Sequence, residues 1–204
     1  MNPDLKRLVD RRSAPSRARD AAAKIADGAA DRRLLDVAIG ELDSPIGELM
    51  VAVTPAGLAY VAFDDEDRGE LLARFARELS PRILGSARAT DEVRRELDEY
   101  FAGERRRFDL RVDRRLMGRF AWEVLRATRR VGFGRTTTYG ELAERVGRPR
   151  AARAVGNALG ANPIPIVIPC HRVLRAGGGV GGYAGGPERK RLLLRLEGWL
   201  EDRG

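Results

Sequence analysis

The stretch AARAVGNALGANPIPIVIPCHRV, residues 151–173, says most about the fold of this 204-residue chain. Its first half has the spacing of a helix rich in Ala and Gly, and it predicts a helix over residues 150–162. Its second half carries three prolines among β-branched residues and predicts an extended segment. The segment ends in the only cysteine and the only histidine of the sequence, Cys170 and His171, side by side.

A single cysteine excludes an intramolecular disulfide. One Cys and one His also cannot supply the four ligands of a structural Cys/His zinc site, so we expect no metal. Cys170 is therefore a free thiol, with two interpretations open. It is either a small buried hydrophobic residue or a nucleophile that needs a base nearby.

If Cys170 is a nucleophile, the identity and position of its activating base have to be explained. On an extended chain neighbouring side chains point to opposite faces, so we expect no direct hydrogen bond between Cys170 and His171. A bridging water or a local bend would have to connect them. A histidine base also needs a carboxylate to orient it. Glu197, in the RLEGW stretch, is the candidate if the last helix folds back onto this segment.

Three regions differ in texture. Residues 1–33 are polar and basic without a sustained apolar period, which predicts a flexible extension. They contain no apolar leader segment, and no stretch of the chain is long and apolar enough for a membrane span, so we expect a cytoplasmic protein.

Residues 34–113 alternate β-prone runs with Pro/Gly turns, then show two helical patterns, the second with Thr90 as N-cap. They predict an α/β domain around a small antiparallel sheet, closed by a strand over 107–113.

Residues 114–204 predict a mostly helical domain. Two short helices, the first capped by Thr137 or Thr138, are separated by a tight Gly/Pro turn in the manner of a helix-turn-helix. A final helix begins near Pro187. Arg150 and Arg153 are spaced to share one helix face, and Ala151 and Gly156 are small enough to let that helix approach a groove closely.

Charge is unevenly distributed. Residues 34–113 hold 11 basic and 18 acidic side chains, whereas residues 114–204 hold 18 basic and seven acidic ones. A basic half of this kind indicates a phosphate-binding surface, although solvated faces of an Arg-rich protein would give the same count. The seven-glycine loop before Pro187 has neither P-loop nor Rossmann spacing, so we expect no nucleotide cofactor. Its composition is typical of a mobile linker or of a lid carrying Tyr183.

Taken together, IPCHRV, the preceding AARAVGNALGANPIPI and the following GYAGG and LEG resemble the O6-alkylguanine-DNA alkyltransferases. The resemblance covers residues 36–200 and includes DSPIGELMVAV as the start of the family's N-terminal domain. It implies a ribonuclease H-like α/β domain followed by a winged helix-turn-helix domain. It also implies direct-reversal repair, in which the protein transfers an alkyl group from guanine O6 in double-stranded DNA, or from O4 of thymine, to its own cysteine. Each protein molecule then acts only once, because the transfer is irreversible.

The resemblance assigns roles by position. Cys170 is similar to the alkyl acceptor, His171 to the base acting through a water, Glu197 to the carboxylate that orients it, and Asn162 to the brace of the site. Arg153 is similar to the arginine that fills the gap left by a flipped base, and Tyr139 to the residue that rotates the nucleotide out. The implied DNA contacts further include Arg150, Ala151 and Gly156, and the implied base pocket Tyr139, Leu159, Val173, Tyr183, Ala184 and Gly185.

Two departures stand out: the lone Cys and His exclude the structural zinc of some relatives, and Ala184 stands where some have Ser. The expected state is a monomer associated with the nucleoid through DNA, with cooperative assembly on DNA left open. The alternative function is a lesion-recognition or regulatory DNA-binding protein without catalysis, which Cys170 argues against. A cysteine hydrolase would need a histidine in direct reach of the thiol.

Overall fold

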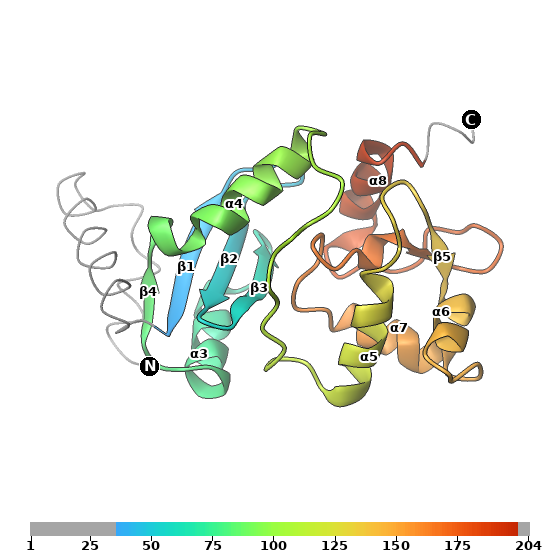
Figure 1. Ribbon diagram of the computed structural model, residues 1–204, viewed down its shortest axis with the longest axis horizontal. Coiled ribbons are helices and arrows are strands. Elements are labelled where there is room, and N and C mark those ends of the chain that lie inside the picture. The colour runs from blue at the N-terminus through green and yellow to red at the C-terminus, as the bar shows by residue number, and fades with distance from the viewer. Residues whose placement is uncertain (1–35, 200–204) are drawn as a thin grey trace. The chain divides into compact units, whose positions relative to one another are not determined.

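The first half of the chain is built around a four-stranded sheet (Figure 1). The computed structural model describes residues 36–199, so the predicted extension at 1–33 lies outside the described residues. The strands are β1 (Val37–Leu42), β2 (Leu49–Thr54), β3 (Gly57–Phe63) and β4 (Ile83–Gly85), in the order β3-β2-β1-β4. The predicted antiparallel meander is confirmed for β1 to β3. β4 pairs parallel to β1, so the sheet as a whole is mixed.

Two helices follow the strands of the meander: α3 (Arg68–Glu78) and α4 (Ala87–Phe101). Val37 and Tyr60 point from the sheet into an apolar cluster with Phe75 of α3. Gly40 lies on the opposite face of β1, and a Cβ there would come within 2.2 Å of Thr90 Oγ1 on α4. The two helices therefore cover opposite faces of the sheet, and α4 packs closely against the backbone of β1.

Two local predictions were wrong. Thr90 is not the N-cap of α4, because the helix begins one turn earlier. Ser86 Oγ accepts from the Ala89 N–H at 3.2 Å, and the Thr90 hydroxyl donates back to the Ser86 carbonyl at 2.9 Å. The strand expected over 107–113 is reduced to one isolated bridge between Val112 and Leu58.

Contacts divide the described chain into two units. The first contains the residues up to Leu97 together with Leu110–Leu116, and the second contains Asp98–Asp109 and the residues from Met117 onward. The last turn of α4 thus belongs to the second unit. Among residues 36–199, no helix is long and apolar enough to cross a membrane.

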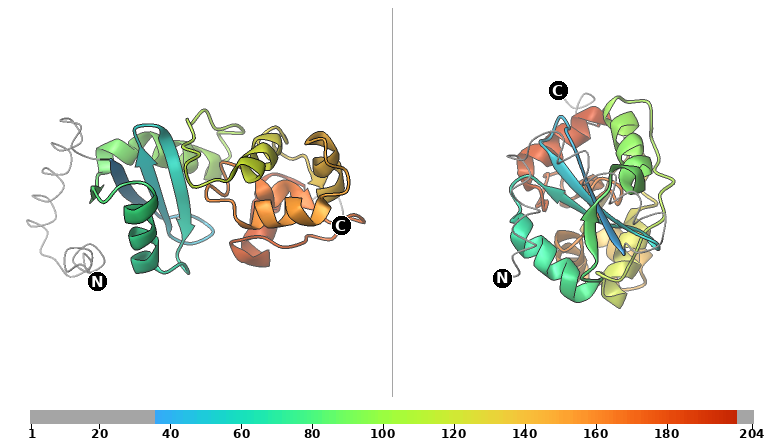
Figure 2. Two further views of the ribbon diagram at one scale, coloured as in Figure 1. Left: turned by 90° about the horizontal axis from the view of Figure 1, so that it is seen from below. Right: turned by 90° about the vertical axis from the view of Figure 1, so that its left-hand side faces the viewer.

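The second unit is mostly helical, as predicted (Figures 1 and 2). Its elements are α5 (Arg119–Thr128), β5 (Thr137–Thr138), α6 (Tyr139–Arg145), α7 (Ala152–Gly160), the 3₁₀ turn η2 (Cys170–Arg172), β6 (Val173–Leu174) and α8 (Gly186–Leu196). Helix α7 packs against both α5 and α6, and η2 packs against α8. The short strands β5 and β6 pair in parallel, which brings the start of α6 beside the residues that follow His171.

The helix-turn-helix geometry follows from its caps. Thr138 caps α6 in a capping box with Glu141, as one of the two predicted caps. Arg148 to Ala151 then form a turn, closed by a 2.9 Å hydrogen bond from the Ala151 N–H to the Arg148 carbonyl. Pro149 occupies the second position of this turn, where its fixed φ is favoured. Arg150 therefore precedes α7, and the expectation that it shares a helix face with Arg153 is wrong.

The close contact at Gly40 generates a stability prediction. We expect Gly40→Ala to lower the free energy of unfolding by about 1–3 kcal/mol, because the added methyl group overlaps Thr90 and either β1 or α4 must shift. Urea denaturation followed by circular dichroism measures this. Gly160→Ala is the matched control, since that helical glycine has no neighbour within 4 Å of its would-be Cβ. Equal stability of the two variants would contradict the assigned packing of α4.

Candidate functional site

Cys170 and His171 sit in a tight turn rather than in an extended segment. The prolines at 163, 165 and 169 have no N–H to donate to a neighbouring strand, so the chain turns on itself. The Ile168 N–H donates to the Ile164 carbonyl at 2.9 Å, and the Arg172 N–H donates to the Pro169 carbonyl at 3.0 Å. Both side chains of the pair are buried. The prediction of an extended segment was wrong.

The same segment carries backbone strain. Ile166 has φ +72°, and it is the only non-glycine residue with positive φ in the part of the chain that the structure describes. A β-branched residue rarely adopts this conformation, which costs roughly 1–3 kcal/mol. Ile166 is itself fully buried, so its burial in the core offsets part of this cost. This strained residue lies four positions before Cys170 in the chain.

The Glu197 carboxylate at the end of α8 collects hydrogen bonds from distant parts of the second unit. His171 Nε2 lies 2.9 Å from Oε1, and the Tyr100 hydroxyl donates to the same oxygen at 2.7 Å. Arg172 donates Nε to Oε2 and Nη2 to Oε1, each at 2.8 Å. The Gly134 N–H donates to Oε2 at 3.2 Å. The structure thus brings Glu197 against His171, as the sequence suggested, and adds Arg172 and Tyr100, which sequence reasoning missed.

These contacts determine the protonation states of Glu197 and His171. Burial alone would raise the pKa of Glu197, but the hydrogen bonds and charges of His171 and Arg172 outweigh it and lower the pKa to about 2. Burial lowers the pKa of His171, against the opposing pull of the Glu197 carboxylate. A neutral His171 beside an ionised carboxylate carries its proton on Nε2. Its Nδ1 is then a lone-pair acceptor, and this buried atom has no hydrogen-bond partner within residues 36–199.

Asn162 holds the sulfur of Cys170. Its Nδ2 donates to Cys170 Sγ at 3.2 Å and to the Ile168 carbonyl at 3.0 Å, while its Oδ1 accepts from the Ile164 N–H at 3.1 Å. Burial raises the pKa of the Cys170 thiol to about 11, although the hydrogen bond from Asn162 and the charge of Lys190 oppose this. The resting thiol is therefore protonated at neutral pH.

Lys190 is a further residue that sequence reasoning missed. It is fully buried on α8, where its Nζ donates to the Val173 carbonyl at 2.7 Å and to the Gly182 carbonyl at 3.2 Å. Burial lowers its pKa to about 8, with the Cys170 charge opposing the shift. Lys190 ties the glycine loop and β6 to the last helix. The carbonyl of Val173, a residue of the base pocket that the resemblance implies, thus accepts a hydrogen bond from within the protein.

The remaining predicted residues surround this core unevenly. A Cβ on Gly156 of α7 would lie 3.8 Å from the Tyr139 ring, and one on Gly181 of the glycine loop 3.1 Å from the Tyr139 hydroxyl. The Tyr183 ring stands edge-on to His171, with centroids 6.3 Å apart. Leu159, Val173 and Gly185 are buried, Ala151 is half-buried, and Arg150, Arg153 and Ala184 are exposed. Within the described residues, no three His, Cys, Asp or Glu side chains gather as a metal site would require.

Comparison with known proteins matches both units. The ribonuclease-like domain of 6-O-methylguanine DNA methyltransferase matches residues 38–114, and the DNA binding domain of the same family matches residues 119–199. A methylated-DNA–protein-cysteine methyltransferase of Methanosarcina acetivorans is 38% identical over 156 residues, 76% of this chain and 95% of that protein. One from Mycolicibacterium paratuberculosis is 42% identical over 76% of this chain and 89% of its own length.

Solved structures agree. The crystal structure of Mycobacterium tuberculosis OGT in complex with DNA has a TM-score of 0.68 and 39% identity, covering 79% of this chain and 92% of that one. The O6-methylguanine-DNA methyltransferase of the archaeon Pyrococcus kodakaraensis has a TM-score of 0.56 at 27% identity, covering 79% of this chain and 99% of that one. The order of units along this chain, a ribonuclease-like unit and then a helical DNA-binding unit, therefore has solved counterparts.

The buried carboxylate generates a second stability prediction. We expect Glu197→Gln to lower the free energy of unfolding at pH 7 by about 3–5 kcal/mol, because it leaves the Arg172 guanidinium buried without its counter-charge. A depressed carboxyl pKa stabilises above its ordinary value of 4.5, and this contribution is lost as pH falls toward about 2. The gap between wild type and variant should be constant above pH 4.5 and shrink below it.

Urea denaturation across a pH series measures this gap. Glu66→Gln is the control, since Glu66 also accepts a tyrosine hydroxyl, from Tyr60 at 2.8 Å, without a buried arginine. It should cost less than Glu197→Gln. Equal losses in the two variants, or a gap that does not change below pH 4.5, would show that Glu197 does not anchor Arg172 electrostatically.

Proposed function

Because the chain belongs to the 6-O-methylguanine DNA methyltransferase family, we propose that Cys170 is the alkyl-accepting residue of its reaction. The protein is a DNA repair methyltransferase that acts by direct reversal, moving an alkyl group from DNA to a cysteine of its own chain. One observation carries the assignment: Cys170 is the only cysteine among 204 residues. Its sulfur is held by Asn162 and it adjoins the His171–Glu197 pair.

The reaction follows from the protonation states of the site. The reactive form of cysteine is the thiolate, and a thiol with a pKa of about 11 needs a base at neutral pH. His171 Nδ1 accepts the thiol proton through a water, and Glu197 stabilises the imidazolium that forms. The thiolate attacks the alkyl carbon on guanine O6, so an S–C bond forms and the C–O bond breaks. The electron pair stays on the guanine, which takes up a proton, and the stable thioether ends the activity of that protein molecule.

The protein binds DNA, and we propose O6-alkylguanine in duplex DNA as its substrate. The target atom lies within the base stack, so the nucleotide must be flipped out, at a cost of a few kcal/mol. Arg153 is exposed near the start of α7, where its side chain can enter the gap left in the stack. We assign the guiding of the nucleotide toward Cys170 to Tyr139, and its position between Gly156 of α7 and Gly181 of the glycine loop supports this role.

The decisive experiment is intact-protein mass spectrometry after incubation with a duplex that contains one O6-methylguanine. We expect the wild-type protein to gain the mass of one methyl group, once per molecule, with the modified peptide containing Cys170. Cys170→Ala should gain nothing. Tight lesion binding without any mass change would favour the non-catalytic lesion-recognition function instead.

Base flipping generates a separate prediction for Arg153. We expect Arg153→Ala to slow single-turnover methyl transfer on duplex DNA by roughly tenfold or more, since unstacking is then not compensated by an inserted side chain. Transfer from a single-stranded oligonucleotide should change little, because no stack has to be opened. Arg191→Ala is the control, as Arg191 is a half-exposed arginine of the same unit that pairs with Glu188 on α8. Equal slowing on both substrates would remove Arg153 from the flipping step.

A further inference from the structure

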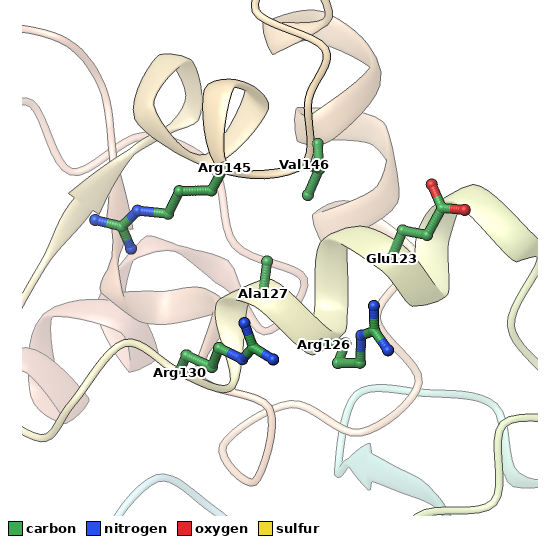
Figure 3. Close-up of a pocket in the computed structure, with 6 residues that line it drawn as sticks. All are labelled: Glu123, Arg126, Ala127, Arg130, Arg145 and Val146. Atoms are coloured by element: carbon green, nitrogen blue, oxygen red, sulfur yellow. The ribbon is translucent and has the colours of Figure 1, made fainter.

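A hollow of about 270 Å³ lies between α5 and α6, and none of the residues assigned to alkyl transfer lines it (Figure 3). Its lining consists of Glu123, Arg126, Ala127, Arg130, Arg145 and Val146. Figure 3 shows Arg126 and Arg130 extending from α5 and the turn after it, while Arg145 extends from the end of α6. Three arginines, from α5, the turn after it and the end of α6, thus line one small depression, together with the apolar side chains of Ala127 and Val146.

The hollow keeps an excess of positive charge. Among the described residues, none of its three arginines lies within 4 Å of a carboxylate, although Arg145 interacts electrostatically with Glu141, one turn before it on α6. The Glu123 carboxylate that shares the lining is instead 3.5 Å from Arg119 and 3.7 Å from Arg148, which neutralise it from outside. All three lining arginines are exposed, so a ligand reaches them without any rearrangement of the core.

The chemistry of the lining fits a phosphate group. The planar fork of an arginine matches phosphate oxygens and binds them through charge-assisted hydrogen bonds. A single carboxylate and a single phosphodiester each offer two charged oxygens, but a DNA strand repeats that charge at every nucleotide and can therefore engage several arginines along its path. The apolar contact offered by Ala127 and Val146 suits the sugar carbons beside such a phosphate.

The position of the hollow in the chain selects DNA as the source of that phosphate. Arg145 and Val146 end α6, and the turn that leads from them to α7 carries the exposed residues Arg148 and Arg150. The same run of exposed arginines ends at Arg153 near the start of α7. A basic path therefore joins the hollow to the helix assigned to the DNA groove.

We propose that the hollow between α5 and α6 binds a backbone phosphate of the DNA duplex and anchors it independently of the lesion. The proposal rests on the proposed function only in taking duplex DNA as the ligand. It assigns Arg126, Arg130 and Arg145 to non-specific affinity and leaves the chemistry at Cys170 unchanged.

The test compares two double variants that each remove two positive charges. Arg126→Gln with Arg130→Gln removes two arginines of the hollow. Arg77→Gln with Arg114→Gln removes two exposed arginines of the ribonuclease-like unit, of which Arg77 has only a 3.9 Å contact to Glu78. Fluorescence anisotropy with an unmodified duplex over a salt series gives the affinity and its salt slope, and thermal melting checks that both variants fold.

We expect the hollow variant to bind about tenfold more weakly at moderate salt. Its slope of log affinity against log salt should become shallower by roughly 1 for each DNA phosphate that the variant no longer neutralises. The control should keep the wild-type slope. Arg145→Gln, on the other wall of the hollow, should reproduce part of the weakening. At saturating O6-methylguanine duplex the rate of methyl transfer should equal that of wild type.

Three outcomes would overturn the proposal. An equal decrease of the salt slope in the two double variants would mean that DNA affinity depends on the net charge of the protein and not on the hollow. An unchanged slope in the hollow variant, combined with stabilisation of the wild type alone by inorganic phosphate, would mean a small-anion site. A slower rate at saturating duplex would mean that the hollow belongs to the catalytic machinery. Because the binding measurements use unmodified DNA, they stand even if the wild-type protein transfers no methyl group.

Discussion

The second unit depends on the burial of one carboxylate, Glu197. A buried carboxylate is unfavourable unless its oxygens are fully hydrogen-bonded. Here the donors come from the end of α4, the loop around Gly134 and the turn η2, and the carboxylate itself ends α8. Satisfying that one group therefore joins four segments that are far apart in the sequence. The pair proposed for catalysis is held by the same network, so the stability of this unit and the geometry of its site have a common origin.

The network also explains why the site rests in an unreactive form. Burial raises the pKa of the Cys170 thiol, and it keeps His171 neutral with its proton directed to Glu197. A permanently ionised thiolate would react with any small electrophile that entered the site, and this protein has only one thiol to use. Because the thiol is protonated at rest, the proposed reaction needs a base that acts when the substrate is in place.

The sequence alone predicts those parts of this arrangement that depend on residues close to one another in the chain. Capping at Thr138 and the β-meander rest on spacing and turn residues, and both agree with the structure. The pairing of Glu197 with His171 was reached from the chemistry a histidine base needs. The contact of Tyr100 with Glu197 could not be predicted in this way, since the two residues are 97 positions apart and Tyr100 has the spacing of an ordinary core residue of α4. The turn at Cys170 was mistaken for an extended segment because β-branched residues between prolines give the same pattern in both.

A count of charges does not distinguish a buried arginine with a structural role from an exposed arginine that can bind a ligand, whereas burial does. Arg172 is enclosed, and its donors are engaged by Glu197 and by the Val131 carbonyl at 2.5 Å. It contributes to the basic total of the C-terminal half without offering any charge to a ligand. The arginines of α5, α6 and the turn before α7 are exposed, and among them Arg119 and Arg148 share one carboxylate, that of Glu123. The exposed charge of the helix-turn-helix and its flank is therefore available to a phosphate backbone, whereas that of Arg172 is not.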